Sequence, residues 1–246
     1  MNCCYIYSPE HNNLFKTFLL KSIETLVLFY NKNINNIYIL ISNTIEDEEY
    51  NSIENKLNEL VKDTNIKIIL KLVDLNITNS IPYPENNRNR FRINRIGLLK
   101  FFIPYLVDVD DILYIDCDIL FKDNIYRELI DNFNDNILIK IFHEGYNSGL
   151  IYFNCKNWRK HSTLFSEIIN FYSTRELKLV DNECFQWIAT ERFKDICYCD
   201  NNRKINFPKE WHPWKDQNVI HVWGRILYKR KVFNEVYNRI INNIEI

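Results

Sequence analysis

Two carboxylates separated by one residue are the clearest chemical signal in the chain. Asp116 and Asp118 directly follow a short apolar run, residues 112–115, which predicts a buried strand. In an extended strand end, residues i and i+2 point to the same side, so both carboxylates can converge on one cation while Cys117 points away. Such pairs are commonly solvated turn residues, but ligands of open α/β sheets bind beyond the carboxyl ends of the strands. The position therefore favours a Mg2+ or Mn2+ site that also takes phosphate oxygens.

A histidine followed by a glycine and several cations forms a second candidate cluster. His221 comes after a strand-like run and precedes Gly224, Arg225 and Lys229. A neutral imidazole can complete a metal shell, and glycine allows the backbone to approach a phosphate closely. Taken alone, His221 is more typical of a core histidine beside a turn.

Two further polar clusters flank predicted elements. Asn147 and Ser148 precede the strand-like run 150–154; their amide and hydroxyl suit hydrogen bonds to sugar hydroxyls, although the same residue types form ordinary turns. Asp181 and Asn182 open a predicted helix. Asp181 is equally suited to capping that helix and to lying in an active site.

The elements that position these residues alternate between strand-like and helix-like segments. Strands are predicted at 3–7, 36–41, 66–75, 112–115, 137–142 and 150–154, and helices at 14–30, 46–61, 91–106, 158–172 and 182–190. This alternation predicts an α/β fold, a single Rossmann-like domain with a mostly parallel central sheet flanked by helices. We expect one domain over residues 1–246, with a nucleotide-binding part at about 1–120 and an acceptor-side part at about 121–246.

Composition excludes several classes of protein. With 46% hydrophobic and 15% aromatic residues the chain is not disordered, and its net charge of -1 argues against a protein that wraps nucleic acid. The seven cysteines are scattered and do not form a disulfide framework. Neither a signal peptide nor a transmembrane run is visible, so the expected location is cytoplasmic. A homodimer is left open.

Taken in order, these motifs resemble the glycogenin-like retaining glycosyltransferases of family 8, which have the GT-A fold. The matching segments are 100–104, 109–120, 146–154, 181–183 and 221–224, and together they extend over residues 90 to 230. The resemblance implies that Asp116, Asp118 and His221 bind Mn2+ or Mg2+ and that the donor is a UDP-sugar. The residues that it implies for donor binding and catalysis are Tyr7, Ser8, Glu10, Lys100, Asp116, Cys117, Asp118, Asn147, Ser148, Asp181, Asn182, His221, Gly224, Arg225 and Lys229.

Two positions and one loop depart from the family pattern. Asn182 stands where the family often has glutamine, and Leu227 stands six residues after the histidine, where the family commonly has lysine. Arg225 or Lys229 is therefore expected to hold the diphosphate. The first loop, residues 7–12, differs from the usual base-binding sequence.

The predicted reaction is transfer of a hexose, with retention at the anomeric carbon, to a carbohydrate-bearing acceptor. Asp181 and Asn182 are the predicted catalytic residues. Trp211 and Trp214 are either an acceptor platform or a structural cluster. The alternatives are a non-catalytic sugar-nucleotide-binding or scaffold protein and a sugar-1-phosphate nucleotidyltransferase; the second is disfavoured because no glycine-rich phosphate loop follows the first strand.

Overall fold

A seven-stranded sheet forms the centre of the computed structural model, which describes residues 1–9, 13–82, 95–131, 135–142, 147–175, 180–200, 205–208, 217–222 and 226–243. The strand order is β3-β2-β1-β4-β7-β6-β8. The strands are β1 (Asn2–Tyr7), β2 (Asn36–Ser42), β3 (Lys67–Val73), β4 (Asp111–Ile115), β6 (Ile139–Phe142), β7 (Leu150–Asn154) and β8 (Cys197–Asp200). Only β7 runs antiparallel to its two neighbours, so four of the six pairings are parallel. The predicted mostly parallel α/β sheet is confirmed.

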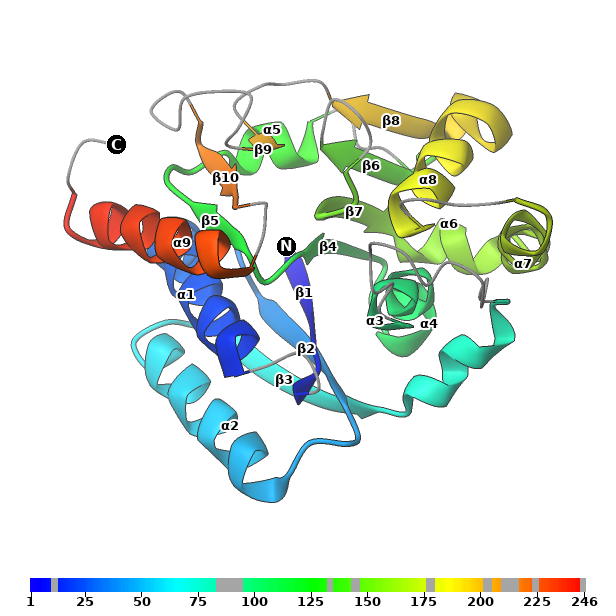
Figure 1. Ribbon diagram of the computed structural model, residues 1–246. Helices are drawn as coiled ribbons and strands as arrows, with labels where there is room; N and C mark the ends of the chain where they lie inside the picture. The colour runs from blue at the N-terminus through cyan, green and yellow to red at the C-terminus, as the bar shows by residue number, and fades with distance from the viewer. Residues whose placement is uncertain are drawn as a thin grey trace.

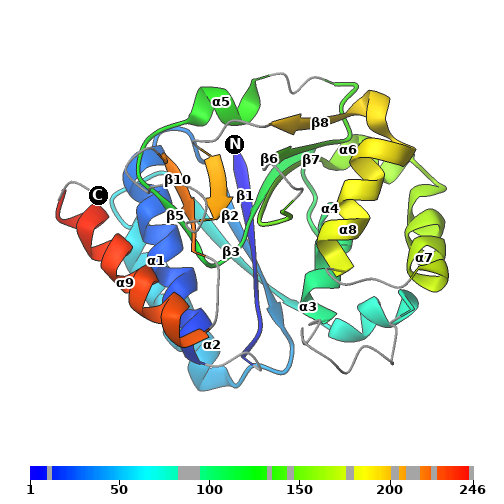
Figure 2. The same cartoon turned by 45° about the horizontal axis from the view of Figure 1, so that its top comes forward.

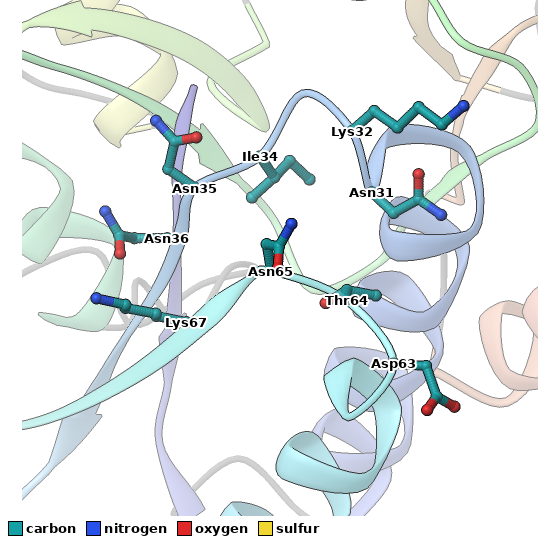
Figure 3. Close-up of a pocket in the computed structure, with 9 residues that line it drawn as sticks. All are labelled: Asn31, Lys32, Ile34, Asn35, Asn36, Asp63, Thr64, Asn65 and Lys67. Carbon is teal, nitrogen blue, oxygen red and sulfur yellow. The ribbon is translucent and has the colours of Figure 1, made fainter.

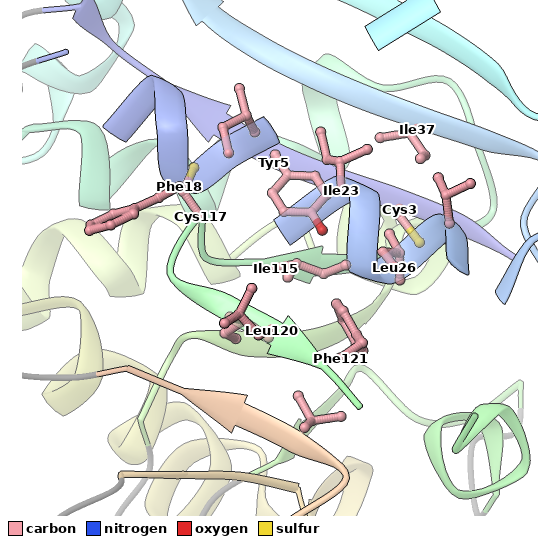
Figure 4. Packing of buried hydrophobic residues seen from close by; sticks show 14 of the residues in the cluster. Cys3, Tyr5, Phe18, Ile23, Leu26, Ile37, Ile115, Cys117, Leu120 and Phe121 are labelled. Carbon is pink, nitrogen blue, oxygen red and sulfur yellow. The ribbon is translucent and has the colours of Figure 1, made fainter. Parts of the chain in front are cut away.

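Both faces of this sheet are covered, as a mostly parallel sheet requires. Side chains alternate along β1 because successive residues of a strand point to opposite faces. Cys3 and Tyr5 pack into one hydrophobic cluster, and Cys4 and Ile6 pack into a second cluster. Figure 4 shows the first cluster, in which Tyr5 lies beside Ile23 and other buried apolar residues.

Three helices cover the face of the first cluster (Figure 1). They are α1 (Asn13–Tyr30), α2 (Asp47–Val61) and α9 (Ile226–Ile241). Helix α2 buries Ile53, Leu57 and Val61, which are spaced four residues apart and so form one apolar stripe. No helix in this described part of the chain meets the length and hydropathy that crossing a bilayer requires.

Shorter helices cover the opposite face. They are α3 (Arg95–Leu98), the 3-10 turn η3 (Leu99–Phe102), α4 (Ile103–Leu106), α6 (Cys155–Lys160), α7 (Leu164–Thr174) and α8 (Val180–Trp187). Aromatic rings join them to each other and to the sheet: Phe101 stacks on Phe185 at 4.6 Å between centroids, and Phe153 packs edge-on against Trp158 at 5.3 Å. The contact between Phe101 and Phe185 holds α8 against η3.

A second sheet of three short strands lies beside α1 (Figure 2). Its order is β5-β10-β9, formed by β5 (Ile119–Phe121), β10 (Val219–His221) and β9 (Ile205–Pro208). Strand β10 is antiparallel to β5, with His221 opposite Ile119. The small sheet therefore ties the C-terminal part of the chain to the segment that follows β4.

The structure divides two of the predicted helices, and the first of them, 91–106, is expected from its sequence to break near Pro104. The predicted helix 91–106 is described only from Arg95, as α3, η3 and α4; Pro104, which lacks a backbone N–H, occupies the first turn of α4. The predicted helix 158–172 is α6 and α7, and the Asn154 side chain caps α6 by accepting a hydrogen bond from Asn157 N. The predicted helix 182–190 is α8 followed by the π-helical turn η4 (Ile188–Arg192). Elements that the sequence patterns do not predict are β5, β8, β9, α5 (Tyr126–Ile130), α9, and the 3-10 turns η2 (Leu75–Ser80) and η5 (Lys194–Ile196).

Candidate metal and donor site

Two carboxylates and one imidazole meet just beyond the carboxyl end of β4. Asp118 Oδ1 lies 3.2 Å from His221 Nε2, and Asp116 Oδ2 lies 3.9 Å from the same nitrogen. The predicted extended conformation is wrong here, because β4 ends at Ile115 and residues 116–118 turn, with Ile119 N donating to Asp116 O. The carboxylates nevertheless converge, as predicted.

The small sheet accounts for the position of His221. Because His221 pairs with Ile119, its imidazole lies beside the carboxylate of the preceding residue, Asp118. Val222 N then donates to Asp118 O at 3.0 Å, which fixes the end of β10 against the turn. The His221 side chain is only 2% exposed.

Asp116, Asp118 and His221, which together form the ligand group, fit a divalent cation. One ligand atom from each of Asp116, Asp118 and His221 lies within 4.8 Å of the other two. Two carboxylate oxygens and one imidazole nitrogen form a mixed donor set, in which the carboxylates favour Mg2+ or Mn2+. Three protein ligands on a partly exposed turn also leave coordination positions for phosphate oxygens, since the Asp116 side chain is 26% exposed.

Gly149 allows the three ligands to come together. Its carbonyl accepts a hydrogen bond from Asp116 N at 2.8 Å, so the start of β7 lies directly under the ligand group. A Cβ atom at position 149 would lie 2.6 Å from His221 Cε1, 2.8 Å from Asn147 Oδ1 and 3.0 Å from Asp116 Oδ2. Side chains larger than hydrogen are therefore excluded by close approach. The sequence Asn147-Ser148-Gly149 predicts a sugar-binding segment or an ordinary turn, and it does not reveal this close approach.

Lys100 is buried beside the ligand group and joins two acidic residues. Its ammonium lies 3.3 Å from Asp116 Oδ1 and 2.8 Å from Asp181 Oδ2, and it donates to both the carbonyl and the hydroxyl of Ser148. Burial alone would lower the pKa of Lys100, but the two carboxylates outweigh it and raise the pKa above its usual value. Lys100 therefore remains a cation.

Lys229 makes an equivalent contact with the other metal-ligand carboxylate. Its ammonium contacts Asp118 Oδ2, while His221 contacts Oδ1 of the same side chain. Burial would raise the pKa of Asp118, but Lys229 and His221 hold that pKa well below its usual range. The sequence predicts Lys229 to lie near a diphosphate, and the structure places its ammonium directly against one of the candidate metal ligands, Asp118.

The polar residues before β7 and in α8 form one network. Asp181 accepts a hydrogen bond from Ser148 Oγ at 2.7 Å, and Asn182 Oδ1 accepts one from Ser148 N at 2.8 Å. Asn147 Oδ1 accepts from Gly149 N at 2.7 Å. Since α8 already begins at Val180, the capping interpretation of Asp181 is wrong and its side chain is directed to Lys100 and Ser148 instead.

The three predicted residues near the end of β1 and in the turn differ in their surroundings. Ser8 is 3% exposed, and within the described residues its hydroxyl makes no hydrogen bond. The Tyr7 hydroxyl donates to Glu49 Oε1 at 2.5 Å. The Cys117 thiol is buried in the core and contacts Ile6 O at 3.3 Å, so this side chain points away from the ligand group.

Several predicted positions lie outside the residues that the structure describes. They are Glu10, Gly224, Arg225, Trp211 and Trp214. Their predicted roles stay predictions.

Tyr114 is a site residue that the sequence analysis does not identify. Its hydroxyl donates to Asp116 Oδ1, and its ring lies 5.0 Å from Lys100 Nζ. Burial, with the nearby Asp116 carboxylate, raises the pKa of Tyr114 well above its usual value, so the hydroxyl stays protonated. The sequence signal is the position of a tyrosine two residues before the first carboxylate, since residues at that spacing share one side of a strand.

A cavity of about 590 Å³ lies at the other end of the sheet (Figure 3). It is lined by residues at the start of β2 and β3 and in the turns before them, including Asn36 and Lys67. Because β2 and β4 run in the same direction, this cavity lies at the amino ends of the strands, whereas the carboxylate–imidazole group lies at their carboxyl ends.

Comparison with solved structures identifies the fold. The galactosyltransferase LgtC, in a complex with donor and acceptor sugar analogues, is 17% identical, with a TM-score of 0.68 over 97% of this chain and 95% of its own. Mouse xyloside xylosyltransferase 1 is 15% identical, with a TM-score of 0.62 over 93% and 99% of the two chains. The glycosyltransferase GlyE of Streptococcus pneumoniae TIGR4 is 15% identical, with a TM-score of 0.65 over 98% of this chain and 62% of GlyE.

Sequence comparison adds no relative to these structures. No protein-family model matches the chain, and no curated protein matches it. The structural similarity extends over nearly the whole chain and agrees with the resemblance that its motifs predict. The chain has the GT-A fold of these glycosyltransferases.

Proposed function

We propose that this protein is a metal-dependent, retaining glycosyltransferase that moves a hexose from a UDP-sugar to a glycan, lipid or protein acceptor. The observation that carries the proposal is the convergence of Asp116, Asp118 and His221 beyond the carboxyl end of β4. On a GT-A fold, this is the edge of the sheet where ligands bind. A bound Mn2+ or Mg2+ would supply charge stabilisation for a departing nucleoside diphosphate.

The basic residues of the site suit a diphosphate. Lys229 is a cation beside Asp118 and takes the part that the family pattern gives to a lysine at position 227, where this chain has leucine. Arg225 is a second candidate for the same role. Ser8 and Tyr7, at the carboxyl end of β1, are proposed to lie near the uridine, together with Glu10 and the backbone at Cys117.

The network around Asp181 suits the transferred sugar. Asp181 and Asn182 are tied to Ser148, and Lys100 neutralises Asp181, so these groups are held in place before a donor arrives. Pre-positioned hydrogen-bonding groups lower the barrier because they do not have to reorganise during the reaction. We assign Asp181 and Asn182 to the sugar face, with Asn147 beside them.

Retention follows if the acceptor attacks from the face that the leaving group vacates. The bond between the anomeric carbon and the diphosphate oxygen breaks, the bond to the acceptor oxygen forms, and the acceptor proton passes to the departing phosphate oxygen. Asp181 is the alternative nucleophile; its ion pair with Lys100 disfavours that role because it neutralises the carboxylate.

The experiment that tests the function is a donor screen. Protein with Mn2+ is assayed for UDP release from UDP-glucose, UDP-galactose and UDP-N-acetylglucosamine, with GDP-sugars as further donors. Asp116→Ala/Asp118→Ala should abolish release. Asp108→Ala/Asp110→Ala is the matched control, since these carboxylates have the same spacing but are exposed at the amino end of β4.

Each outcome has a clear meaning. Metal-dependent UDP release from one donor, lost only in the first double variant, supports the proposal and names the sugar. If the protein neither binds any of these donors nor releases UDP from them, that result would favour a scaffold protein. Product with an inverted anomeric centre would refute retention while leaving glycosyl transfer in place.

The remaining assignments are also proposals. The nucleotide is assigned to about residues 1–120 and the acceptor to about residues 121–246. A carbohydrate-bearing acceptor is the expected partner, and the cytoplasm is the expected location. The oligomeric state stays a prediction.

A further inference from the structure

Tyr114 lies where it can control one of the metal-ligand carboxylates. It is a residue of β4, 3% exposed, and its neighbours in the sheet are Cys4 in β1 and Ile151 in β7. Its ring packs in the second hydrophobic cluster, which restricts its movement. Its hydroxyl donates to Asp116 Oδ1.

The two oxygens of Asp116 have different surroundings. Oδ1 is contacted by the Tyr114 hydroxyl and by Lys100 Nζ at 3.3 Å. Oδ2 is on the side of His221, 3.9 Å from its Nε2 atom. A Cβ atom at Gly149 would lie 3.0 Å from Asp116 Oδ2 and 2.6 Å from His221 Cε1. Asp116 Oδ2 therefore faces His221, while Oδ1 faces Tyr114 and Lys100.

The Asp116 carboxylate would otherwise have a soft orientation. The terminal torsion of an aspartate joins an sp3 carbon to an sp2 carbon, and its energy profile is broad and roughly two-fold. Two donors on one oxygen remove that freedom. Lys100 divides its contacts between Asp116, Asp181 and Ser148, whereas the tyrosine hydroxyl donates to Asp116 alone among the described residues.

We infer that Tyr114 is a positioning residue, which holds Asp116 Oδ1 so that Oδ2 alone is presented to the divalent cation. The inference rests on the proposed metal dependence. It adds that Asp116 binds the cation through one carboxylate oxygen, Oδ2. Partners that orient a metal ligand typically change metal affinity 10- to 100-fold when they are removed. Tyr114 therefore sets how tightly the site binds its cation.

The test is Tyr114→Phe in the full chain. Phenylalanine keeps the ring beside Lys100 and removes only the hydroxyl. Tyr152→Phe is the matched control, because Tyr152 is 5% exposed and donates to Asp111 Oδ1 at 2.7 Å, in the adjacent strand and away from the ligand group. Both variants lose one buried tyrosine–aspartate hydrogen bond, so both should unfold at a similarly reduced temperature.

The discriminating measurement is the Kd for Mn2+ by titration calorimetry without donor. We expect Tyr114→Phe to weaken Mn2+ binding about 10- to 100-fold, and Tyr152→Phe to leave it within about twofold of the unsubstituted protein. Saturating Mn2+ should restore most of the UDP-release rate of Tyr114→Phe, since the ligands themselves are intact.

Other outcomes overturn the inference. Unchanged Mn2+ affinity in Tyr114→Phe would refute it and leave the proposed function standing. Equal weakening in both tyrosine variants would reduce Tyr114 to a structural role. Absence of Mn2+ binding by the unsubstituted protein would refute the proposed metal dependence together with this inference.

Discussion

Gly149→Ala is the sharpest structural test of the ligand group. The substitution adds one methyl group at the start of β7. The new Cβ would be 2.6 Å from His221 Cε1, whereas ordinary contacts of this kind begin at 3.4 Å. The imidazole or the backbone must therefore move by about 0.8 Å, the difference between these two distances.

A displacement of this size is large for a metal site. Ligand distances in metal sites hold to about ±0.2 Å, and a misplacement of about 1 Å in an active site can cost about 100-fold in rate. The added methyl also contacts Asn147 and Asp116, so no single rotation of His221 relieves it. We expect Mn2+ affinity and UDP release each to fall about 100-fold, with a loss of about 1–3 kcal/mol in the free energy of unfolding.

The assay compares Gly149→Ala with Gly97→Ala. A Cβ at Gly97 would meet Asp181 Cγ and Oδ2 at 3.7 Å, which is an ordinary contact, so this control adds a methyl group near the same site without displacement. Titration calorimetry with Mn2+ and UDP release are measured for both variants. Retention of wild-type Mn2+ affinity by Gly149→Ala, or an equal loss in Gly97→Ala, would refute the close-approach argument.

Three further predictions concern the charged groups around the site. Lys229→Gln should tighten Mn2+ binding several-fold in the absence of donor, because Lys229 competes with the cation for Asp118. The same substitution should weaken UDP binding. Calorimetry with each ligand alone measures both affinities, and an unchanged Mn2+ affinity would contradict the competition. In EDTA, acid should destabilise the fold through Asp118: its pKa is lower in the folded state than the usual 3.8, so its contribution is present above that value and is lost as the pH falls through the folded pKa. Lys100 has the opposite sign: its pKa is raised above 10.5, so its contribution is present below 10.5 and is lost as the pH rises through the folded pKa. Urea unfolding across the pH range measures both limbs, and an acid limb of the same slope in Asp118→Asn would exclude Asp118 as its source.

The elements that the sequence predicts are those with a recognisable local pattern of residues. Strand β2 is a run of apolar residues buried between two parallel neighbours, and α2 has an apolar stripe with an acidic first turn, so both can be identified from their own residues. Strands β5 and β10 have only three residues each. The strand-like run before His221 predicts β10, but the pairing of β10 with β5 joins segments about a hundred residues apart, and no local periodicity reports that pairing.

The site divides in the same way. Asp116, Asp118 and His221 are found from the order of motifs along the chain, because carboxylates after a buried strand have a meaning that does not require coordinates. The contact between Lys100 and Asp181 joins residues 81 positions apart. The role of Gly149 depends on distances to three side chains, and it is a fact about the folded structure alone.

The charges of the site themselves argue for a bound cation. Three carboxylates, those of Asp116, Asp118 and Asp181, face two ammonium groups, those of Lys100 and Lys229, among the described residues. With His221 neutral, as a metal ligand must be, these side chains sum to a charge of about -1, which repels a diphosphate at close range. A divalent cation changes that sum to about +1 and makes the same pocket attractive to the diphosphate of a sugar nucleotide. Donor affinity should therefore depend on the metal more steeply than any single hydrogen bond would allow, and UDP affinity that is equal with and without Mn2+ would refute this electrostatic account.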